Sequence, residues 1–491
     1  MRNTKLMGLG LAVMLLFTGC GATTASTPDT DTNVITETDA TEDTATEDAT
    51  PEDAIPSGEE TSGGAVIVYF ANWNLDNKPA EQGGEVAGIP WDKVSYINHA
   101  FWAVAPADGS TRSSIEQRNS GEGARTAFKI VSTDAKSDYE DTTPSAVNAD
   151  MPRNHFAEYA AYSEQYPDVN VMISIGGWSR SGYFSEMAYT EEGRQSCIQS
   201  CLDLMDEYPW IDGIDIDWEY PAGSKDGERA SEGNGDEGCP IFGSASEDNA
   251  NFATFLSELR TALDEHFGKG SKKLTACASA STGWTLPCQD WAAFAPYLDM
   301  INIMTYDLAG VWDDSAGHAG SFISAKSAAV YFKMLDIPMS KLCIGSPLYT
   351  TTLLLKEVPS TGIAIGAPIE GYKPVSEEME EAQVEAFEAE AVSGYTVVRS
   401  GSQWVLNETF DNGGVGWHQV YDDKKGGAYL YNDDEASPYY KWFISYENHL
   451  SLQEKLDYIR DMGLAGIIVW ETSQDDAQHS FVTQMGDNLI P

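Results

Sequence analysis

The stretch DGIDIDWEYP, residues 212–221, places acidic side chains at alternate positions of an otherwise apolar run. Successive side chains of a strand point to opposite faces, so Asp215, Asp217 and Glu219 are expected on one face, about 6.5 to 7 Å apart. The opposite face carries Ile, Ile and Trp, which argues against a solvated acidic strand or a calcium loop. The stretch therefore predicts a buried strand that presents three carboxyl groups.

Three carboxyl groups at this spacing cannot all ionise near neutral pH in a site of low dielectric constant. At least one is therefore expected to stay protonated with a raised pKa. A protonated acid beside an ionised one suits the cleavage of glycosidic bonds. Asp212 lies outside the alternating face and is expected to be structural.

The pattern Asp-Gly-x-Asp-x-Asp-x-Glu followed by Tyr-Pro resembles the signature of the family 18 glycoside hydrolases, the chitinases and their relatives. The motif is specific because four acids stand at fixed spacing. The resemblance covers about residues 66–475, which is essentially the whole folded chain.

Short β-rich apolar runs recur along the chain, separated by amphipathic or loop-rich stretches. The eight runs are 66–71, 94–101, 169–175, 213–218, 274–279, 300–304, 342–347 and 465–470. Apolar residues at steps of three and four predict helices at 191–207, 249–266, 323–335 and 452–462. The economical interpretation is an α/β fold, a (β/α)8 TIM barrel, in which functional residues lie at the carboxyl ends of the strands.

Two connections are too long to be simple crossovers. Residues 103–155 are polar and rich in Gly and Ser, which predicts surface loop with little core. Residues 350–441, between the seventh and eighth strands, contain an acidic stretch and strand-like runs. The acidic stretch is 377–390, and the strand-like runs are 395–398, 402–406 and 426–431. They predict a small inserted α+β subdomain, which relatives of this family often carry there.

The first 64 residues have the composition of export and tethering segments. Residues 1–19 begin with Arg2 and Lys5 and continue as an apolar run too short to span a bilayer, which predicts a signal peptide. The following Cys20 ends a sequence similar to a bacterial lipobox and is expected to carry lipid, with ordinary secretory cleavage as the alternative. Residues 20–64 contain twelve acids and no Lys or Arg, and almost no apolar content, which predicts a disordered tether. The catalytic domain is expected at 65–491, outside the cell and anchored to its membrane.

The chain is strongly acidic, with a formal net charge of −48. Loss of Arg2 and Lys5 with the signal peptide gives −50, and removal of the tether's twelve acids gives about −38. This charge makes nucleic acid an unsuitable partner, whereas a neutral polymer is not repelled. The cysteines show no metal-ligand spacing, and no metal, cofactor or disulfide is assigned; Cys197 and Cys201, at helical spacing, are expected to lie near each other.

The other strand ends match further motifs of the family. The third ends in Ser-Ile-Gly-Gly-Trp at 174–178, similar to the family's Ser-x-Gly-Gly. The sixth ends in Met-Thr-Tyr-Asp at 304–307, similar to Met-x-Tyr-Asp, and the eighth ends at Trp470. The resemblance implies substrate contacts from Tyr69, Phe101, Ser174, Gly176, Gly177, Trp178, Tyr220, Met304, Asp307, Trp312, Tyr349 and Trp470. Thr350-Thr351 stand where many relatives have Gly-Arg, which puts a sugar contact from that Arg in doubt.

The resemblance also implies a mechanism in which the substrate supplies the nucleophile. Glu219 would act as general acid, and the substrate's own acetamido oxygen would attack the anomeric carbon. Asp217 would accept a hydrogen bond from the acetamido N–H, and Tyr306 would donate one to the acetamido carbonyl oxygen. Asp215 would share a proton with Asp217. The expected product has retained configuration.

The expected substrate is chitin or another N-acetylglucosamine oligosaccharide with β-1,4 bonds, cleaved by a monomeric enzyme. N-glycans and peptidoglycan remain alternatives, as does a sugar-binding lipoprotein without catalysis. Other chemistries find no support, because the sequence has no Gly-rich phosphate loop, no Gly-x-Ser-x-Gly and no His-Glu-x-x-His.

Overall fold

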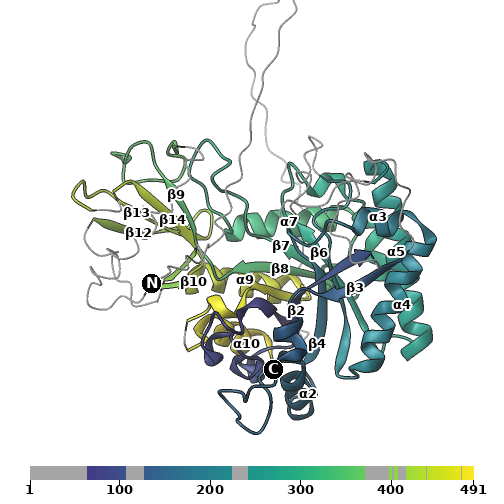
Figure 1. Ribbon diagram of the computed structural model, residues 1–491. Coiled ribbons are helices and arrows are strands. Elements are labelled where there is room, and N and C mark those ends of the chain that lie inside the picture. The colour runs from purple at the N-terminus through teal and green to yellow at the C-terminus, as the bar shows by residue number, and fades with distance from the viewer. Residues whose placement is uncertain are drawn as a thin grey trace, which may run out of the picture. The chain divides into compact units, whose positions relative to one another are not determined.

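Within the part of the chain that the structure describes, eight parallel strands close into a barrel (Figure 1). They are β1 (Ala65–Ala71), β2 (Tyr96–Pro106), β4 (Asn170–Gly176), β5 (Ile211–Asp217), β6 (Lys273–Ser279), β7 (Met300–Met304), β8 (Leu342–Pro347) and β15 (Gly466–Trp470). Each strand pairs with its neighbour, and β1 pairs with both β15 and β2, which closes the sheet. The eight predicted runs and the barrel are confirmed.

The computed structural model describes residues 63–106, 127–223, 242–370, 397–400, 403–406, 416–437, 440–476 and 478–491. All of them belong to one compact unit of the chain. The predicted signal peptide, Cys20, almost all of the tether and the acidic stretch 377–390 lie outside these residues. Within the described ranges, no helix is long and apolar enough to cross a bilayer.

The four predicted helices are present around the barrel. They are α4 (Glu191–Glu207), α5 (Ala245–Phe267), α7 (Phe322–Met334) and α9 (His449–Met462). Each is preceded by a Thr, Ser or Asn whose side chain accepts a hydrogen bond from a backbone N–H of the first turn. Because Ser244 provides this cap, α5 starts at Ala245, earlier than predicted. The described residues contain four further helices that were not predicted: α2 (His155–Gln165), α3 (Phe184–Tyr189), α6 (Trp291–Phe294) and α10 (Ser480–Leu489).

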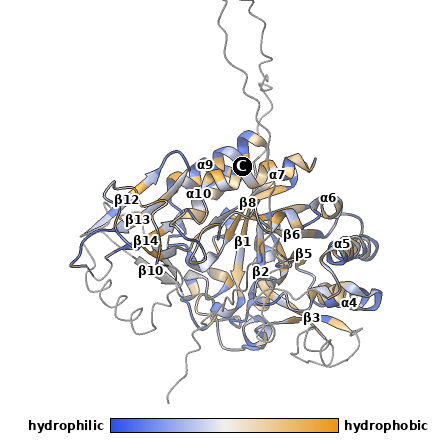
Figure 2. Ribbon diagram, turned by 90° about the horizontal axis from the view of Figure 1, so that it is seen from above, coloured by the Kyte–Doolittle hydropathy of each residue, from blue (hydrophilic) through white to orange (hydrophobic). Residues whose placement is uncertain are grey.

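The main core lies between the barrel strands and these helices. Trp218, just past β5, is 1% exposed, stacks on Phe184 of α3 with ring centroids 5.4 Å apart, and meets Phe252 of α5 edge to face. Figure 2 shows apolar colour on the strands, whereas α4 and α5 also carry hydrophilic stretches. The apolar face predicted for residues 212–221 is therefore buried against helices.

The connection between the second and third barrel strands was predicted as surface loop with little core, which is wrong where it carries buried side chains such as Phe128 and Asp138. Residues 107–126 of this connection lie outside the described residues. β2 runs on to Pro106, and β3 (Phe128–Ser132) pairs with its end in antiparallel direction. A short helical turn, η5 (Lys136–Glu140), follows and delivers Asp138 into the interior. The polar composition was misleading because these polar side chains are buried together and satisfy one another.

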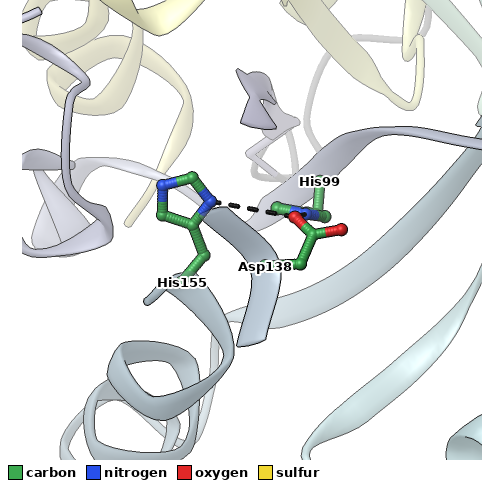
Figure 3. A group of neighbouring side chains, drawn as sticks. All are labelled: His99, Asp138 and His155. Atoms are coloured by element: carbon green, nitrogen blue, oxygen red, sulfur yellow. Dashed lines mark hydrogen bonds and ion pairs between the residues drawn. The ribbon is translucent and has the colours of Figure 1, made fainter. Parts of the chain in front are cut away.

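Figure 3 shows that buried group: the rings of His99 from β2 and His155 from the start of α2 both face Asp138. His99 Nε2 lies 2.7 Å from Asp138 Oδ1, and His155 Nδ1 lies 3.9 Å from the same oxygen. Ser132 and Asn72 donate further hydrogen bonds to Asp138. The three side chains are close enough to hold a metal ion. However, the carboxylate of Asp138 already accepts hydrogen bonds from several donors, which indicates a structural network.

The insertion between β8 and β15 forms a separate antiparallel sheet. Its strands are β12 (Trp417–Asp422), β13 (Gly427–Asn432), β14 (Trp442–Tyr446) and β9 (Thr351–Leu354), and β10 (Val397–Ser400) pairs with β11 (Gln403–Leu406). Leu353, Tyr429 and Phe443 form part of its small core. The predicted strands of the insertion are present, whereas its predicted acidic stretch falls outside the described residues.

Candidate active site

The acids of β5 lie at the carboxyl end of the barrel at increasing distance from its interior. Asp215 is fully buried, Asp217 is 3% exposed and ends the strand, and Glu219 is half-buried two residues later. Asp212 faces elsewhere and accepts a hydrogen bond from the backbone N–H of Val171, as expected for a structural residue. The alternation predicted from sequence therefore produces a row of carboxyl groups from the barrel interior outward.

Asp215 is surrounded by hydrogen-bond donors from four other strands. They are Tyr69 Oη at 3.0 Å, Ser174 Oγ at 2.7 Å, Thr275 Oγ1 at 2.5 Å and Asn302 Nδ2 at 3.1 Å. Burial raises the pKa of Asp215, and these donors act in the opposite direction by stabilising the carboxylate. Both oxygens of Asp215 already accept hydrogen bonds and its side chain is buried, so Asp215 cannot reach a substrate to attack it.

Asp217 has an unusual combination of burial and unused hydrogen-bonding capacity. Burial, followed by the charges of Glu219 and Asp215, raises its pKa well above the ordinary value for an aspartate. Its Oδ1 has no hydrogen-bond partner among the described residues, although it is buried. A buried carboxyl oxygen without a partner is costly, so this oxygen is placed to receive a donor from a ligand.

Glu219 is held at the strand end through its backbone. Its N–H donates to Ser181 Oγ at 3.0 Å, and the Ser181 hydroxyl lies 2.9 Å from the carbonyl oxygen of Gly177. Burial raises the pKa of Glu219 to about 7, with a hydrogen bond from Tyr220 lowering it and the charge of Asp307 raising it. A carboxyl group with this pKa can both donate and accept a proton near neutral pH.

The two glycines that follow β4 make the close approach to β5 possible. The register pairs Ser174 with Asp215 and Gly176 with Asp217. A Cβ on Gly176, whose φ is +116°, would lie 2.1 Å from the carbonyl oxygen of Asp217. A Cβ on Gly177 would lie 2.5 Å from the ring of Phe101. The close packing of β4 against β5 and Phe101 therefore requires glycine at both positions.

Aromatic side chains gather around β1, β2 and the end of β15. Trp470 stacks on Phe101 with ring centroids 5.4 Å apart and an angle of 15° between the rings, and it lies 5.7 Å from Tyr69. Trp73, which sequence reasoning missed, is 43% exposed and lies 6.3 Å from both Phe101 and Trp470. Rings of this kind offer flat faces for stacking on sugars.

The end of β7 supplies the second group of predicted residues. Tyr306 is buried and meets Tyr349 edge to face at 6.1 Å, whereas Met304 is half-buried and Asp307 is exposed with a φ of +53°. The charge of Asp217 contributes to the raised pKa of Tyr306, so the two side chains interact electrostatically.

The remaining predicted contacts lie further out. Trp178 is 54% exposed and lies 6.5 Å from the half-buried Tyr220, while Trp312 is 66% exposed.

Sequence reasoning also missed Ser181, Thr275, Cys277 and Asn302. The last three stand at inward-facing positions of predicted strands, where Val, Ile or Leu would be ordinary. Polar residues at such positions of β6 and β7 were the available signal, since they line the same interior as Asp215.

Comparison with known proteins identifies the family. The family described as Glycosyl hydrolases family 18 matches residues 65–475. Chitinase A of Pseudoalteromonas piscicida is 25% identical over 448 residues, covering 83% of this chain and 50% of the relative. The chain thus spans about half or less of the length of the first curated relatives it matches.

Two solved structures have the same fold. The chitinase ChiW from Paenibacillus sp. str. FPU-7 is 26% identical with a TM-score of 0.61, covering 87% of this chain and 43% of that one. A family 18 N-acetylglucosaminidase from Paenibacillus barengoltzii is 23% identical with a TM-score of 0.59, covering 87% of this chain and 100% of that one. With the barrel, the β5 acids and a family match over most of its length, this chain belongs to the family 18 glycosyl hydrolases.

Proposed function

We propose that this protein is a retaining hydrolase that cleaves β-1,4 bonds of chitin or related N-acetylglucosamine polymers, with the substrate supplying the nucleophile. The observation that carries the proposal is that the three acids differ in burial, pKa and hydrogen bonding. Glu219 is half-buried with a pKa of about 7, Asp217 has an oxygen without a partner among the described residues, and the oxygens of Asp215 accept hydrogen bonds from several donors. A conventional retaining enzyme needs a second exposed carboxylate as nucleophile, and neither inner acid fits that role.

In the first step, Glu219 gives its proton to the oxygen of the leaving sugar. The acetamido oxygen of the remaining sugar attacks the anomeric carbon from the other face, which forms an oxazolinium ion and breaks the glycosidic bond. Asp217 Oδ1 accepts a hydrogen bond from the acetamido N–H, and the negative charge of Asp217 stabilises the positive oxazolinium ion. Tyr306, whose raised pKa keeps its hydroxyl protonated, donates to the acetamido oxygen.

In the second step, Glu219 is ionised and takes a proton from a water molecule. The water opens the oxazolinium ring from the side that the leaving sugar has vacated. The product therefore keeps the configuration of the substrate, and Glu219 is returned to its protonated form.

The relatives support the substrate class, because several carry the name chitinase. The similar protein from Paenibacillus barengoltzii is an N-acetylglucosaminidase, which favours N-acetylglucosamine units as the common element. N-glycans and peptidoglycan contain the same unit and are the competing substrates. A sugar-binding protein without catalysis is disfavoured by the presence of Glu219 at the strand end.

The deciding experiment is a product profile on chitin oligosaccharides, a high-mannose glycopeptide and peptidoglycan, followed by NMR. Cleavage of the chitin oligosaccharides with the β-anomer appearing first supports the proposal. Cello-oligosaccharides, which lack the acetamido group, serve as the control and are expected to be inert. First appearance of the α-anomer, or equal cleavage of cellulose oligomers, would contradict substrate assistance.

We further propose that Cys20 carries lipid and places the enzyme on the outer side of a bacterial cell membrane. The support is the sequence alone, namely the apolar leader followed by Phe-Thr-Gly-Cys at 17–20 and the acidic tether. An enzyme tethered in this way would act on soluble or loosened chains that reach the cell surface.

A further inference from the structure

Tyr306 follows directly on the point where β7 leaves the barrel sheet. The pairing of β7 with β8 ends at Ile303 and Ile344. If this parallel ladder continued, the N–H of Gly345 would donate to the carbonyl oxygen of Ile303, and the carbonyl oxygen of Gly345 would accept from the N–H of Thr305. The two β7 groups instead bond to each other, with Thr305 N 2.8 Å from Ile303 O. The chain therefore turns out of the sheet just before Tyr306.

The side chain of Thr305 replaces the two backbone bonds that the turn removes. Its Oγ1 accepts a hydrogen bond from the N–H of Gly345 at 2.7 Å and donates one to the carbonyl oxygen of Gly345 at 2.7 Å. A hydroxyl group can do both, because it carries one donor and two acceptor lone pairs. Thr305 is fully buried, so without this hydroxyl the Gly345 N–H would be left buried and unpaired. The residue before Tyr306 is thus fastened to β8.

Gly345 is itself held from its other sides. It pairs with Ile468 of β15, and its carbonyl oxygen also accepts a hydrogen bond from Lys455 Nζ of α9 at 3.2 Å. Lys455 is fully buried and forms an ion pair with Glu447. Because a buried charge is costly to separate from its partner, this pair fixes the Lys455 ammonium against β8. Thr305 is therefore tied to a part of the barrel that has little freedom to move.

The absence of a side chain at Gly345 also makes room for the tyrosine ring. A Cβ on Gly345 would lie 2.7 Å from Cε1 and 2.9 Å from Cδ1 of Tyr306, so the ring lies directly on the backbone of β8. The same ring meets Tyr349 edge to face, with centroids 6.1 Å apart. Gly345 thus locates Tyr306 twice, through the hydroxyl of Thr305 and through contact with the ring.

We propose that Thr305 is a positioning residue that, together with Gly345, sets where the Tyr306 hydroxyl stands when it donates to the acetamido oxygen of the substrate. The inference rests on the proposed function and deepens it. The hydroxyl lies at the far end of a long side chain, so a small change of the backbone at its base displaces it. A displacement of about 1 Å can lower a rate by roughly 10²-fold.

The test compares Thr305→Val and Thr305→Ser in the full chain with a soluble chitin oligosaccharide. Valine has nearly the shape of threonine but cannot bond to Gly345. We expect kcat to fall roughly ten-fold or more in Thr305→Val, since the Tyr306 hydroxyl loses its place, while KM changes little. Thr305→Ser keeps the hydroxyl and should recover most of the wild-type kcat. An unchanged kcat in Thr305→Val would overturn the proposal.

A double-mutant cycle shows whether Thr305 acts through Tyr306. An enzyme that carries Tyr306→Phe has no hydroxyl to position, so adding Thr305→Val should lower kcat little further. An aryl glycoside with a good leaving group keeps the turnover of these variants measurable. Equal fold losses in the two backgrounds would show that Thr305 does not act through the Tyr306 hydroxyl.

Ser145→Ala is the matched control. Ser145 is 4% exposed and lies in the connection between β2 and β4. Its hydroxyl donates to Glu85 and accepts from the N–H of Val147 at 3.2 Å. Thr305→Val and Ser145→Ala both remove one buried hydroxyl that donates and accepts, and both should lower the Tm. Only Thr305→Val should lower kcat, and a similar fall in the two variants would reduce Thr305 to a structural role.

A further measurement needs no turnover. In protein labelled with fluorotyrosine, the fluorine NMR resonance that is absent from Tyr306→Phe belongs to Tyr306. It should move in Thr305→Val and stay in place in Ser145→Ala, and an unmoved resonance in Thr305→Val would overturn the positioning role even in an active enzyme. If the resonance moves but the wild-type protein cleaves no N-acetylglucosamine polymer, the proposed function is overturned and the positioning of Tyr306 by Thr305 stands.

Discussion

The ring of Trp470 at the end of β15 stacks on the ring of Phe101 in the middle of β2, with centroids 5.4 Å apart. Phe101 is in turn confined by Gly177, where even a Cβ would come within 2.5 Å of its ring. Three segments distant in sequence thus fix the position of one half-buried indole beside the β5 acids. The indole is rigid before any ligand arrives, which reduces the entropy lost on binding.

Replacing Trp470 with Ala is expected to weaken substrate binding. The loss of one stacking face costs on the order of 1 to 2 kcal/mol, which corresponds to roughly a ten-fold rise in KM for a short chitin oligosaccharide. Trp470→Phe keeps a flat ring and should lose less. Steady-state kinetics measure the effect, and an unchanged KM in Trp470→Ala would show that the indole does not hold sugar.

Glu219→Gln is expected to abolish most cleavage while leaving the fold intact. Removal of a positioned general acid lowers the rate by roughly 10² to 10⁴-fold. The loss should be greatest for natural sugars, which are poor leaving groups, and smaller for an activated aryl glycoside. Circular dichroism and Tm check the fold, and a variant with wild-type turnover on chitin oligosaccharides would remove Glu219 from the mechanism.

The alkaline limb of kcat/KM should report the ionisation of Glu219. This acid must be protonated to act, and burial raises its pKa to about 7, so activity should fall as the pH rises through that value. The negative charge of Asp307 adds to the shift, and Asp307→Asn should therefore move the limb to lower pH. A limb that stays in place, or moves upward, would contradict this electrostatic relationship.

Glu158 on α2 should make the stability of the fold fall as the pH rises from about 4.5 to about 8. Burial raises its pKa from an ordinary value of 4.5 to about 8, so its contribution to stability is fully present below pH 4.5 and is lost as the pH rises through the folded-state pKa of about 8. Glu158→Gln should flatten the fall in Tm across this range. Glu164→Gln, an exposed change on the same helix, is the control and should leave the profile unaltered.

The proposed lipid anchor predicts that the protein fractionates with membranes. Cys20→Ala should release it into the soluble fraction with unchanged turnover on soluble oligosaccharides, because the anchor is separate from the catalytic barrel. Fractionation and mass spectrometry of the N-terminus provide the measurement. Recovery of the wild-type protein as an unacylated species in the medium would contradict the anchor and favour ordinary secretion.

The sequence by itself determined the barrel and the row of acids. Strand runs and one alternating segment depend on local periodicity, which a sequence displays directly, and the eight strands follow those runs closely. The glycines at 176 and 177 were also visible in the sequence as part of the Ser-x-Gly-Gly match, and the close approach that they permit depends on the backbone. The identity of the outermost acid, Glu219, required only its position at the end of a strand.

Only the tertiary structure decided which polar side chains surround those acids. Thr275, Cys277 and Asn302 reach Asp215 across neighbouring strands, and this contact depends on the register between strands, which the spacing within one strand does not contain. The buried pair of His99 and Asp138 was missed for the same reason. Polar residues in a long connection resemble surface loop until a partner far away in sequence makes their burial favourable.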